Sequence, residues 1–447
     1  MSSFSCSAFF RACYASLVSF ICFTDSSAQN TTDINTLLTG GGVPQSVPAP
    51  NFMIAAAASP AAATPSAAAA GYQSSPGPWG TIVGDYIYLE APASLIENFA
   101  LPSTQPRWSF PLSFKPKLDA FFTEAGLTQD QIATLMLPAA QVVEGELLHV
   151  LPSVQLVEQL PAKARAHIYS ELGKLPANEY CMDPVLITGT SVQEWYRTSK
   201  LRKELIDKIE QLSYMRGETI AFSDIPVLLN YAQADSEARA IFKACTRTRA
   251  LMVRLKIDET SNIADLVSYW SFGVSVRRKD IEPLIRSIAD SGTLHDLGLS
   301  HILPAQPRKL LYSYPGLDMA KNGLLPDCHW TSLNFYNFDA HQYVLDSRLA
   351  TSQVLENFVP VEAPYQFGDI LFFLDNQTGD AFHSCVHLAD EIVFTKNGRN
   401  ILSPWIIMKL EDVKKVYLFR GNGRVHCGAA PEVGRAPAAG GGEEGRR

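Results

Sequence analysis

The pattern of apolar residues changes after Ile302, and this change divides the folded part of the chain in two. Before it, apolar residues recur at helical spacing, as at Leu205 and Ile209. After it, short runs rich in Ile, Val and Phe are separated by turn signals, which is typical of strands. The sequence therefore predicts an α+β protein, with a mainly helical domain over residues 81–300 and a second, sheet-containing domain over residues 301–427.

Capping signals and spacing indicate individual elements within both domains. Thr128 and Gln131 match a capping box, and Ser191 with Glu194 opens another helix, which is expected to continue past Ile209 and to stop at Gly217. Further helices are expected over residues 163–172, 236–256, 261–269 and 279–290, and extended segments over residues 81–89 and 108–112. In the second domain, one helix is expected to begin near Asp327, followed by strands over residues 370–374, 386–388, 392–394 and 405–408.

Three outer segments are not expected to belong to either folded domain. Residues 1–28 resemble an export signal, with an apolar stretch too short to span a bilayer before a small-residue cleavage site. A misassigned start codon is the alternative explanation. Residues 29–80, rich in Ala, Pro and Ser, and residues 428–447 cannot bury enough surface to fold and are expected to be disordered. We therefore expect a secreted or periplasmic protein with no integral membrane segment after signal removal.

Charge and cysteine usage limit the function classes. A formal net charge of -8 over 447 residues gives no basic surface for nucleic acid. The chain has no Gly-rich phosphate loop and no Cys-x-x-Cys pair, so neither a nucleotide cofactor nor a structural zinc site is indicated. After residue 28 the chain holds five cysteines, an odd number, which leaves at least one thiol unpaired even in an oxidising compartment.

Cys328 is the candidate nucleophile. It lies in Pro326-Asp327-Cys328-His329-Trp330, where a loop is expected to turn into a helix. The unpaired backbone N–H groups of a helix start lower a thiol pKa and can bind the oxyanion that forms when a thiolate attacks a carbonyl. A buried cysteine with no chemical role is the alternative interpretation.

His383 is the candidate base. It follows Cys328 by 55 residues and opens a strand that contains Cys385 and His387. An imidazole on a sheet strand beside a cysteine at a helix start can take the thiol proton. Because His383, Cys385 and His387 alternate along the strand, they could also face one metal ion, but the outer two lie about 13 Å apart on a straight strand. No metal is therefore expected.

These motifs resemble the NlpC family of papain-like cell-wall cysteine peptidases. Asp327-Cys328 is similar to the family's Asp-Cys-Ser-Gly motif, Gly368 to Phe373 to its Gly-Asp-Leu-Val-Phe-Phe segment, and His383 to Asp390 to its His-Val-Gly-Ile-Tyr-Leu-Gly strand. The resemblance implies a nucleophile helix packed on an antiparallel sheet, hydrolysis of amide bonds and peptidoglycan stem peptides as substrate. It covers about 75 residues, so it implies nothing for the helical domain.

Two departures from the family pattern bear on activity. His329-Trp330 replaces the small Ser-Gly pair, which predicts a narrower groove beside the thiol. The family's third catalytic residue has no clear match: cross-strand pairing would bring Thr395 opposite Cys385 and Asn397 opposite His383. Asn397 is chemically the better residue to orient the imidazole, although Asn-Gly is also a common hairpin turn.

The sequence thus supports two principal hypotheses. The first is an exported cysteine hydrolase, a thiol protease or amidase with Cys328, His383 and Asn397 as candidate catalytic residues, no cofactor and a peptide or peptidoglycan substrate. The alternative is a non-catalytic binding module on an NlpC-type fold whose catalytic residues have decayed. A helical scaffold in which the hydrolase part is incidental is a third. The sequence leaves the oligomeric state open.

Overall fold

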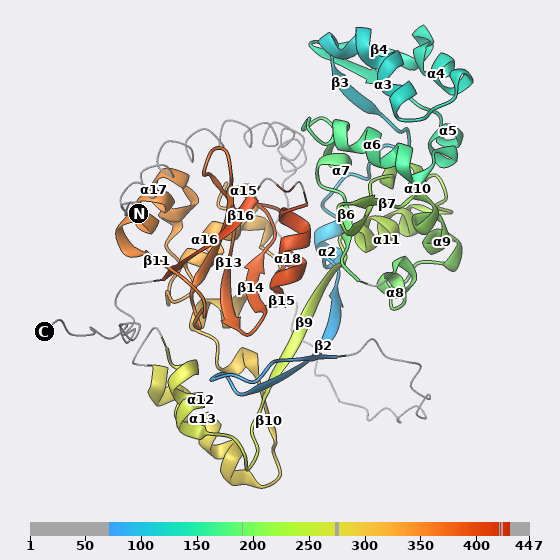
Figure 1. Ribbon diagram of the computed structural model, residues 1–447. Coiled ribbons are helices and arrows are strands. Elements are labelled where there is room, and N and C mark those ends of the chain that lie inside the picture. The colour runs from blue at the N-terminus through green and yellow to red at the C-terminus, as the bar shows by residue number, and fades with distance from the viewer. Residues whose placement is uncertain (1–70, 190, 273–276, 420, 422, 430–447) are drawn as a thin grey trace, which may run out of the picture.

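The computed structural model describes residues 71–429, except 190, 273–276, 420 and 422 (Figure 1). The expected export signal, residues 29–70 of the expected tether and nearly all of the expected tail lie outside the described residues. Residues 71–80 of that tether are part of the fold. Strand β1 (Tyr72–Gln73) pairs with β2, and the buried Tyr72 donates a hydrogen bond to the Asp390 carboxylate, at 2.8 Å. Among the described residues, no helix combines the length and apolar character needed to cross a membrane.

A long antiparallel ribbon joins the two halves of the molecule (Figure 1). It consists of β2 (Thr81–Leu89) and β9 (Thr248–Lys256), paired along their whole length, and β10 (Asp296–Gly298) extends the same sheet. The helix expected over residues 236–256 is therefore wrong in its second half, because α11 ends at Cys245. In β9, Leu251, Val253 and Leu255 are buried against partner elements, so pairing with β2 overrides helical propensity.

The N-terminal lobe, residues 90–247, contains more sheet than the sequence indicated. Its helices are α2 (Ala93–Ile96), α3 (Leu118–Glu124), α4 (Gln129–Met136), α5 (Val154–Gln159), α6 (Ala162–Leu172), α7 (Glu179–Met182), α8 (Val192–Tyr196), α9 (Lys203–Leu212), α10 (Ile225–Leu229) and α11 (Asp235–Cys245). Its two antiparallel sheets have the strand orders β3-β5-β4 and β6-β8-β7, from β3 (Trp108–Pro111), β4 (Gln141–Glu144), β5 (Leu147–Val150), β6 (Val185–Ile187), β7 (Tyr214–Arg216) and β8 (Thr219–Phe222). Most of these strands are too short to show an alternating pattern.

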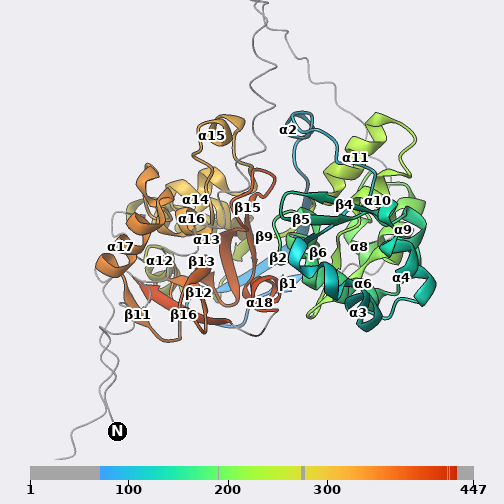
Figure 2. The same ribbon diagram turned by 90° about the horizontal axis from the view of Figure 1, so that it is seen from above.

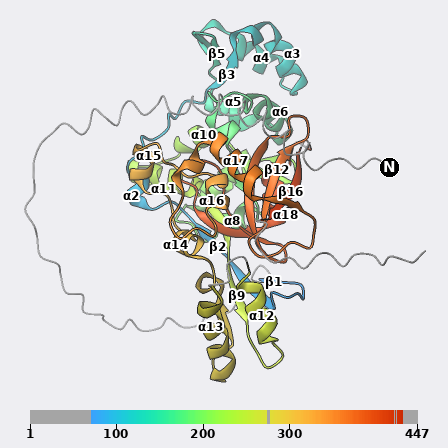
Figure 3. The same cartoon turned by 90° about the vertical axis from the view of Figure 1, so that its left-hand side faces the viewer.

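Several features of this lobe follow the sequence closely: the helix expected over residues 163–172 is α6, and the extended segment expected over residues 108–112 is β3. Thr128 caps α4 through a capping box with Gln131, as expected. The helix predicted to run from Ser191 past Ile209 is instead two helices, α8 and α9, separated by residues 197–202. Helices α12 (Ile263–Trp270) and α13 (Arg278–Ser291) lie at the end of the molecule opposite β3 and β5 (Figure 3), where Tyr269 and Trp270 of α12 contact Phe367 of the C-terminal domain.

The C-terminal domain is built on a six-stranded antiparallel sheet of order β11-β16-β12-β13-β14-β15. Its strands are β11 (Val359–Val361), β12 (Ile370–Asp375), β13 (Ala381–Ala389), β14 (Ile392–Lys396), β15 (Trp405–Lys409) and β16 (Gly423–Ala429). Its helices are α14 (Ala305–Leu310), α15 (Leu317–Lys321), α16 (Cys328–Leu333), α17 (Ser347–Asn357) and α18 (Leu410–Tyr417). Mixed helices and antiparallel sheets make the protein α+β.

Two helices cover opposite faces of this sheet. Successive side chains of β12 point to opposite faces of the sheet and belong to two hydrophobic cores. Phe372 belongs to the same core as Trp330 of α16, whereas Phe373 belongs to the same core as Val413 of α18. Helix α18 lies on the side of the domain that faces the N-terminal lobe (Figure 2). The sheet thus holds α16 and α18 in fixed positions on either side of β13.

Candidate active site

Cys328 is the first residue of α16, and the local sequence explains why the helix begins there. The Asp327 side chain caps the helix by accepting a hydrogen bond from the Trp330 backbone N–H at 2.8 Å. Cys328 is 5% exposed, so the thiol is buried. The helix is shorter than the expected segment from Asp327 to Tyr336, because it ends at Leu333.

His383 lies in β13 and is completely buried. Its Nε2 lies 3.2 Å from the Thr395 hydroxyl, and its Nδ1 is buried without a hydrogen-bond partner among the described residues. The ring stacks on Tyr417 of α18, with centroids 3.8 Å apart and an interplanar angle of 13°. The imidazole is therefore fixed in orientation, with one nitrogen free to exchange a proton.

The structure brings Cys328 and His383 together with a third group, His329. Burial raises the pKa of the Cys328 thiol, but the positive charges of His329 and His383 outweigh burial and lower it to about 5. A thiol with this pKa is a thiolate at neutral pH, and the thiolate is the nucleophilic form.

Thr395, rather than Asn397, contacts the candidate base. The pairing of Val386 with Phe394 continues to place Thr395 opposite Cys385, on the sheet face that His383 also occupies. Asn397 donates its amide N–H to the Met408 sulfur at 3.7 Å, and its Oδ1 is buried with no hydrogen-bond partner among the described residues. The candidate role of Asn397 in orienting the imidazole therefore has no contact to support it in this structure.

Sequence reasoning missed the contribution of His329, which it treated only as a bulky replacement in the groove. Its Nδ1 lies 3.0 Å from the Ser384 hydroxyl and its Nε2 lies 3.2 Å from the Ala381 carbonyl oxygen. Burial lowers the pKa of His329, but the negative charge of Cys328 outweighs burial and raises it to about 9. The signal in the sequence was the position of a titratable residue directly after the nucleophile.

A buried lysine, also missed from the sequence, lies near the thiol. The Lys396 ammonium donates hydrogen bonds to the carbonyl oxygens of Gly398, at 2.8 Å, and Asn400, at 2.7 Å. Burial lowers the pKa of Lys396 to about 7, although the nearby charges of Asp327 and Cys328 act in the opposite direction. Lys396 therefore fixes the turn after β14 and adds positive potential beside the thiolate.

Cys385 and His387 do not join His383 in one site. Cys385 is completely buried, and burial, followed by the charge of Cys328, raises its thiol pKa well above the ordinary value. The two ring nitrogens of His387 lie 3.1 Å and 3.0 Å from the carbonyl oxygens of Gln366 and Asp390. In the part of the chain that the structure describes, no three His, Cys, Asp or Glu side chains are grouped so as to hold a metal ion.

Helix α18 connects the site to the rest of the molecule. Asp412 on this helix pairs with Arg249 of the ribbon at 3.0 Å, and both side chains are largely buried. Just after the helix, the Phe419 ring lies 4.0 Å from the Arg216 guanidinium of the N-terminal lobe. The helix whose Tyr417 stacks on His383 is therefore held by both the ribbon and the N-terminal lobe.

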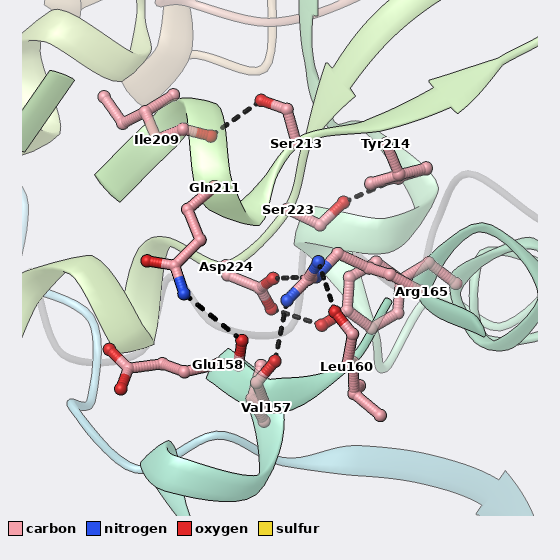
Figure 4. Close-up of polar contacts among 11 residues, drawn as sticks. Val157, Glu158, Leu160, Arg165, Ile209, Gln211, Ser213, Tyr214, Ser223 and Asp224 are labelled. Atoms are coloured by element: carbon pink, nitrogen blue, oxygen red, sulfur yellow. Dashed lines mark hydrogen bonds and ion pairs between the residues drawn. The ribbon is translucent and has the colours of Figure 1, made fainter. Parts of the chain in front are cut away.

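A second buried polar cluster lies in the N-terminal lobe (Figure 4). The Arg165 guanidinium, which is completely buried, donates to the Asp224 carboxylate at 2.9 Å and to the carbonyl oxygens of Leu160, at 3.1 Å, and Val157, at 2.6 Å. Tyr169 donates to the other Asp224 oxygen. Because these groups bond to one another, the cluster joins α5 and α6 to the start of α10 and leaves no free group for chemistry.

Comparison of the chain with protein-family models, with curated proteins and with solved structures found no match.

Proposed function

We propose that this protein is a cysteine hydrolase of the NlpC type, which cleaves amide bonds in peptides and has peptidoglycan stem peptides as its substrate class. The observation that carries the proposal is the environment of Cys328. Its thiol lies at a helix start beside His383, whose Nδ1 has no other partner among the described residues and whose Nε2 is bonded to Thr395. The export signal expected over residues 1–28 would deliver the enzyme to the periplasm or outside the cell.

The proposed reaction follows the chemistry of an activated thiol. The Cys328 thiolate attacks the amide carbonyl carbon, and the carbonyl electron pair moves to oxygen, near the backbone N–H groups at the start of α16. The tetrahedral intermediate collapses when His383 gives its proton to the leaving amine. Water, deprotonated by His383, then hydrolyses the thioester and restores the thiol.

Access to the thiol requires movement, because Cys328 is 5% exposed and His383 is completely buried. We infer that the Tyr417 side chain moves aside to admit substrate, since its ring covers one face of the imidazole. Tyr417→Ala is expected to raise the rate of iodoacetamide labelling of Cys328 severalfold, because it removes a ring that packs beside the site. Tyr343→Ala, at a tyrosine that is 48% exposed, is the matched control. An unchanged labelling rate in Tyr417→Ala would show that the Tyr417 ring does not control access.

The two candidates for the third residue make different predictions. Thr395→Ala removes the only side-chain hydrogen bond described for the His383 ring and is expected to lower kcat for amide hydrolysis about tenfold or more, with little change in KM. Asn397→Ala removes a weak contact to the Met408 sulfur and is expected to change kcat much less. The reverse order of effects would assign the orienting role to Asn397.

The proposed function is tested by incubating the purified protein with peptidoglycan fragments and with synthetic stem peptides, and analysing the products by mass spectrometry. The wild-type protein is expected to release peptide fragments, and Cys328→Ser is expected to release none above background. Cys245→Ser, at a cysteine of the N-terminal lobe, is the matched control and is expected to retain activity. Equal cleavage by the wild type and Cys328→Ser would exclude this chemistry.

Two observations favour a second candidate, a binding module without activity. The thiol is almost completely covered, and Thr395 stands where the resemblance implies an imidazole or amide. A binding module would retain stem peptides on the wild-type protein and on Cys328→Ser with equal affinity, and neither protein would cleave them.

A further inference from the structure

The residue after the nucleophile has its own set of hydrogen bonds to the strand that carries the base. His329 projects from the first turn of α16, and its two ring nitrogens contact β13 at Ala381 and Ser384, on either side of His383. The two imidazoles therefore approach the Cys328 thiol from positions fixed by the same strand.

The partners of His329 fit a ring that carries protons on both nitrogens. The Ala381 carbonyl oxygen can only accept, so the Nε2 that faces it at 3.2 Å must carry a proton. On the other side, the Ser384 hydroxyl donates its single proton to the Ser332 hydroxyl at 3.1 Å, which leaves the Ser384 oxygen free to accept from Nδ1–H. Both N–H groups of an imidazolium are thus satisfied.

The hydrogen bonding of the His383 ring differs from that of His329. One of its nitrogens contacts the Thr395 hydroxyl and the other has no hydrogen-bond partner among the described residues. A ring with one free nitrogen can take and release a proton without breaking another hydrogen bond, whereas His329 would lose the contact to an acceptor if it released one. The two histidines are therefore suited to different tasks.

We propose that His329 is a further catalytic-site residue, a fixed imidazolium that holds Cys328 as a thiolate while His383 alone transfers protons. The inference rests on the hydrolase proposed above, because it assigns a role within that reaction. The raised pKa of His329, about 9 after burial is outweighed by the charge of Cys328, agrees with a ring that stays charged at neutral pH.

Any test must distinguish the effect of His329 on the thiol pKa from the effects of the other charged and titratable groups near the thiol. They come from each element packed around it: Asp327 at the N-cap of α16, His383 and Cys385 of β13, Lys396 of β14 and Tyr417 of α18. Because His383 also favours the thiolate, removing His329 should raise the thiol pKa without abolishing thiolate formation at high pH.

The test is the pH titration of thiolate ultraviolet absorbance, measured as the difference between each protein and the same protein with Cys328→Ser. This readout does not depend on access to the buried thiol. His329→Gln is expected to raise the titration midpoint by about 1–3 pH units. Ser384→Ala, which removes the acceptor for Nδ1–H, is expected to raise it by less. His341→Gln, at an exposed histidine stacked on Tyr343, is the control and should leave the midpoint unchanged.

An unchanged midpoint in folded His329→Gln would overturn the proposal, as would an unchanged midpoint in Ser384→Ala if His329→Gln does not fold. A midpoint that responds to His383→Gln but to neither of these variants would assign the thiolate to His383 alone. If the midpoint depends on His329 but the wild type cleaves no stem peptide, the hydrolase proposal fails and the role of His329 in holding the thiolate stands.

Discussion

Replacing His383 by glutamine is expected to lower kcat/KM for stem-peptide hydrolysis by about 10²–10⁴-fold, the usual contribution of a positioned acid–base group. Glutamine preserves polarity and approximate size but cannot take the thiol proton or give one to the leaving amine. The loss should appear at every pH, because no other group in this arrangement has a free ring nitrogen beside the thiol. Steady-state kinetics across a pH series measures it.

The matched control is His387→Gln. His387 lies on the same strand, but its ring nitrogens contact the carbonyl oxygens of Gln366 and Asp390 rather than the thiol. It is expected to alter stability more than kcat. If His383→Gln keeps kcat/KM within a factor of about three of the wild type, His383 is not the acid–base group of this reaction.

Asp224→Ala is expected to destabilise the protein by about 3–5 kcal/mol, because it leaves the Arg165 guanidinium buried without its partner. Arg165 is completely buried, and Asp224 is 6% exposed. Burial raises the pKa of Asp224 to about 6 even though Arg165 and Tyr169 oppose this rise, so desolvation of the pair is expensive. Removing one charge of the pair is therefore expected to lower the free energy of unfolding more than replacing both residues by apolar ones.

Urea unfolding of the full chain, followed by circular dichroism, measures this effect. The double variant Arg165→Met with Asp224→Leu removes both charges and is expected to recover much of the lost free energy of unfolding. Glu194→Ala breaks the pair with Arg197, whose side chain is 65% exposed, and should cost less than about 1 kcal/mol. A cost for Asp224→Ala as small as that for Glu194→Ala would contradict the structural role assigned to the cluster.

The elements around the thiol could be predicted from local sequence, whereas in the lobe that faces them only some elements could be, such as α6 and β3. The start of α16 follows from the capping side chain of Asp327, and the strands around His383 follow from short apolar runs between turn residues. In contrast, β9 has residues that suit a helix equally well, and only its pairing with β2 decides its structure. Strands of three or four residues in the N-terminal lobe give no periodic signal at all.

The contacts of the candidate site could likewise be predicted only in part from the sequence. The nearness of His383 to Cys328 was expected from motif order, and the expected position of Thr395 opposite Cys385 agrees with the pairing of Val386 with Phe394. Which of Thr395 and Asn397 contacts the ring depends on side-chain direction at the end of β14, where the turn begins, and a linear pattern does not determine that. The contacts of His329 with β13 depend on how α16 packs on the sheet, which is a tertiary property.

The central claim is that Cys328 is a reactive thiolate, and its rate of alkylation tests this most directly. In the native protein, iodoacetamide at neutral pH should modify Cys328 faster than Cys245, because burial raises the pKa of the Cys245 thiol to about 12, whereas the two imidazoles outweigh burial and lower that of Cys328 to about 5. The thiolate is the deprotonated form, so the Cys328 rate should be level near neutral pH and fall as the pH drops through 5. Peptide mass spectrometry at timed intervals measures both cysteines in one sample. Modification of Cys328 no faster than Cys245, or a rate that rises steadily up to pH 9, would contradict the account.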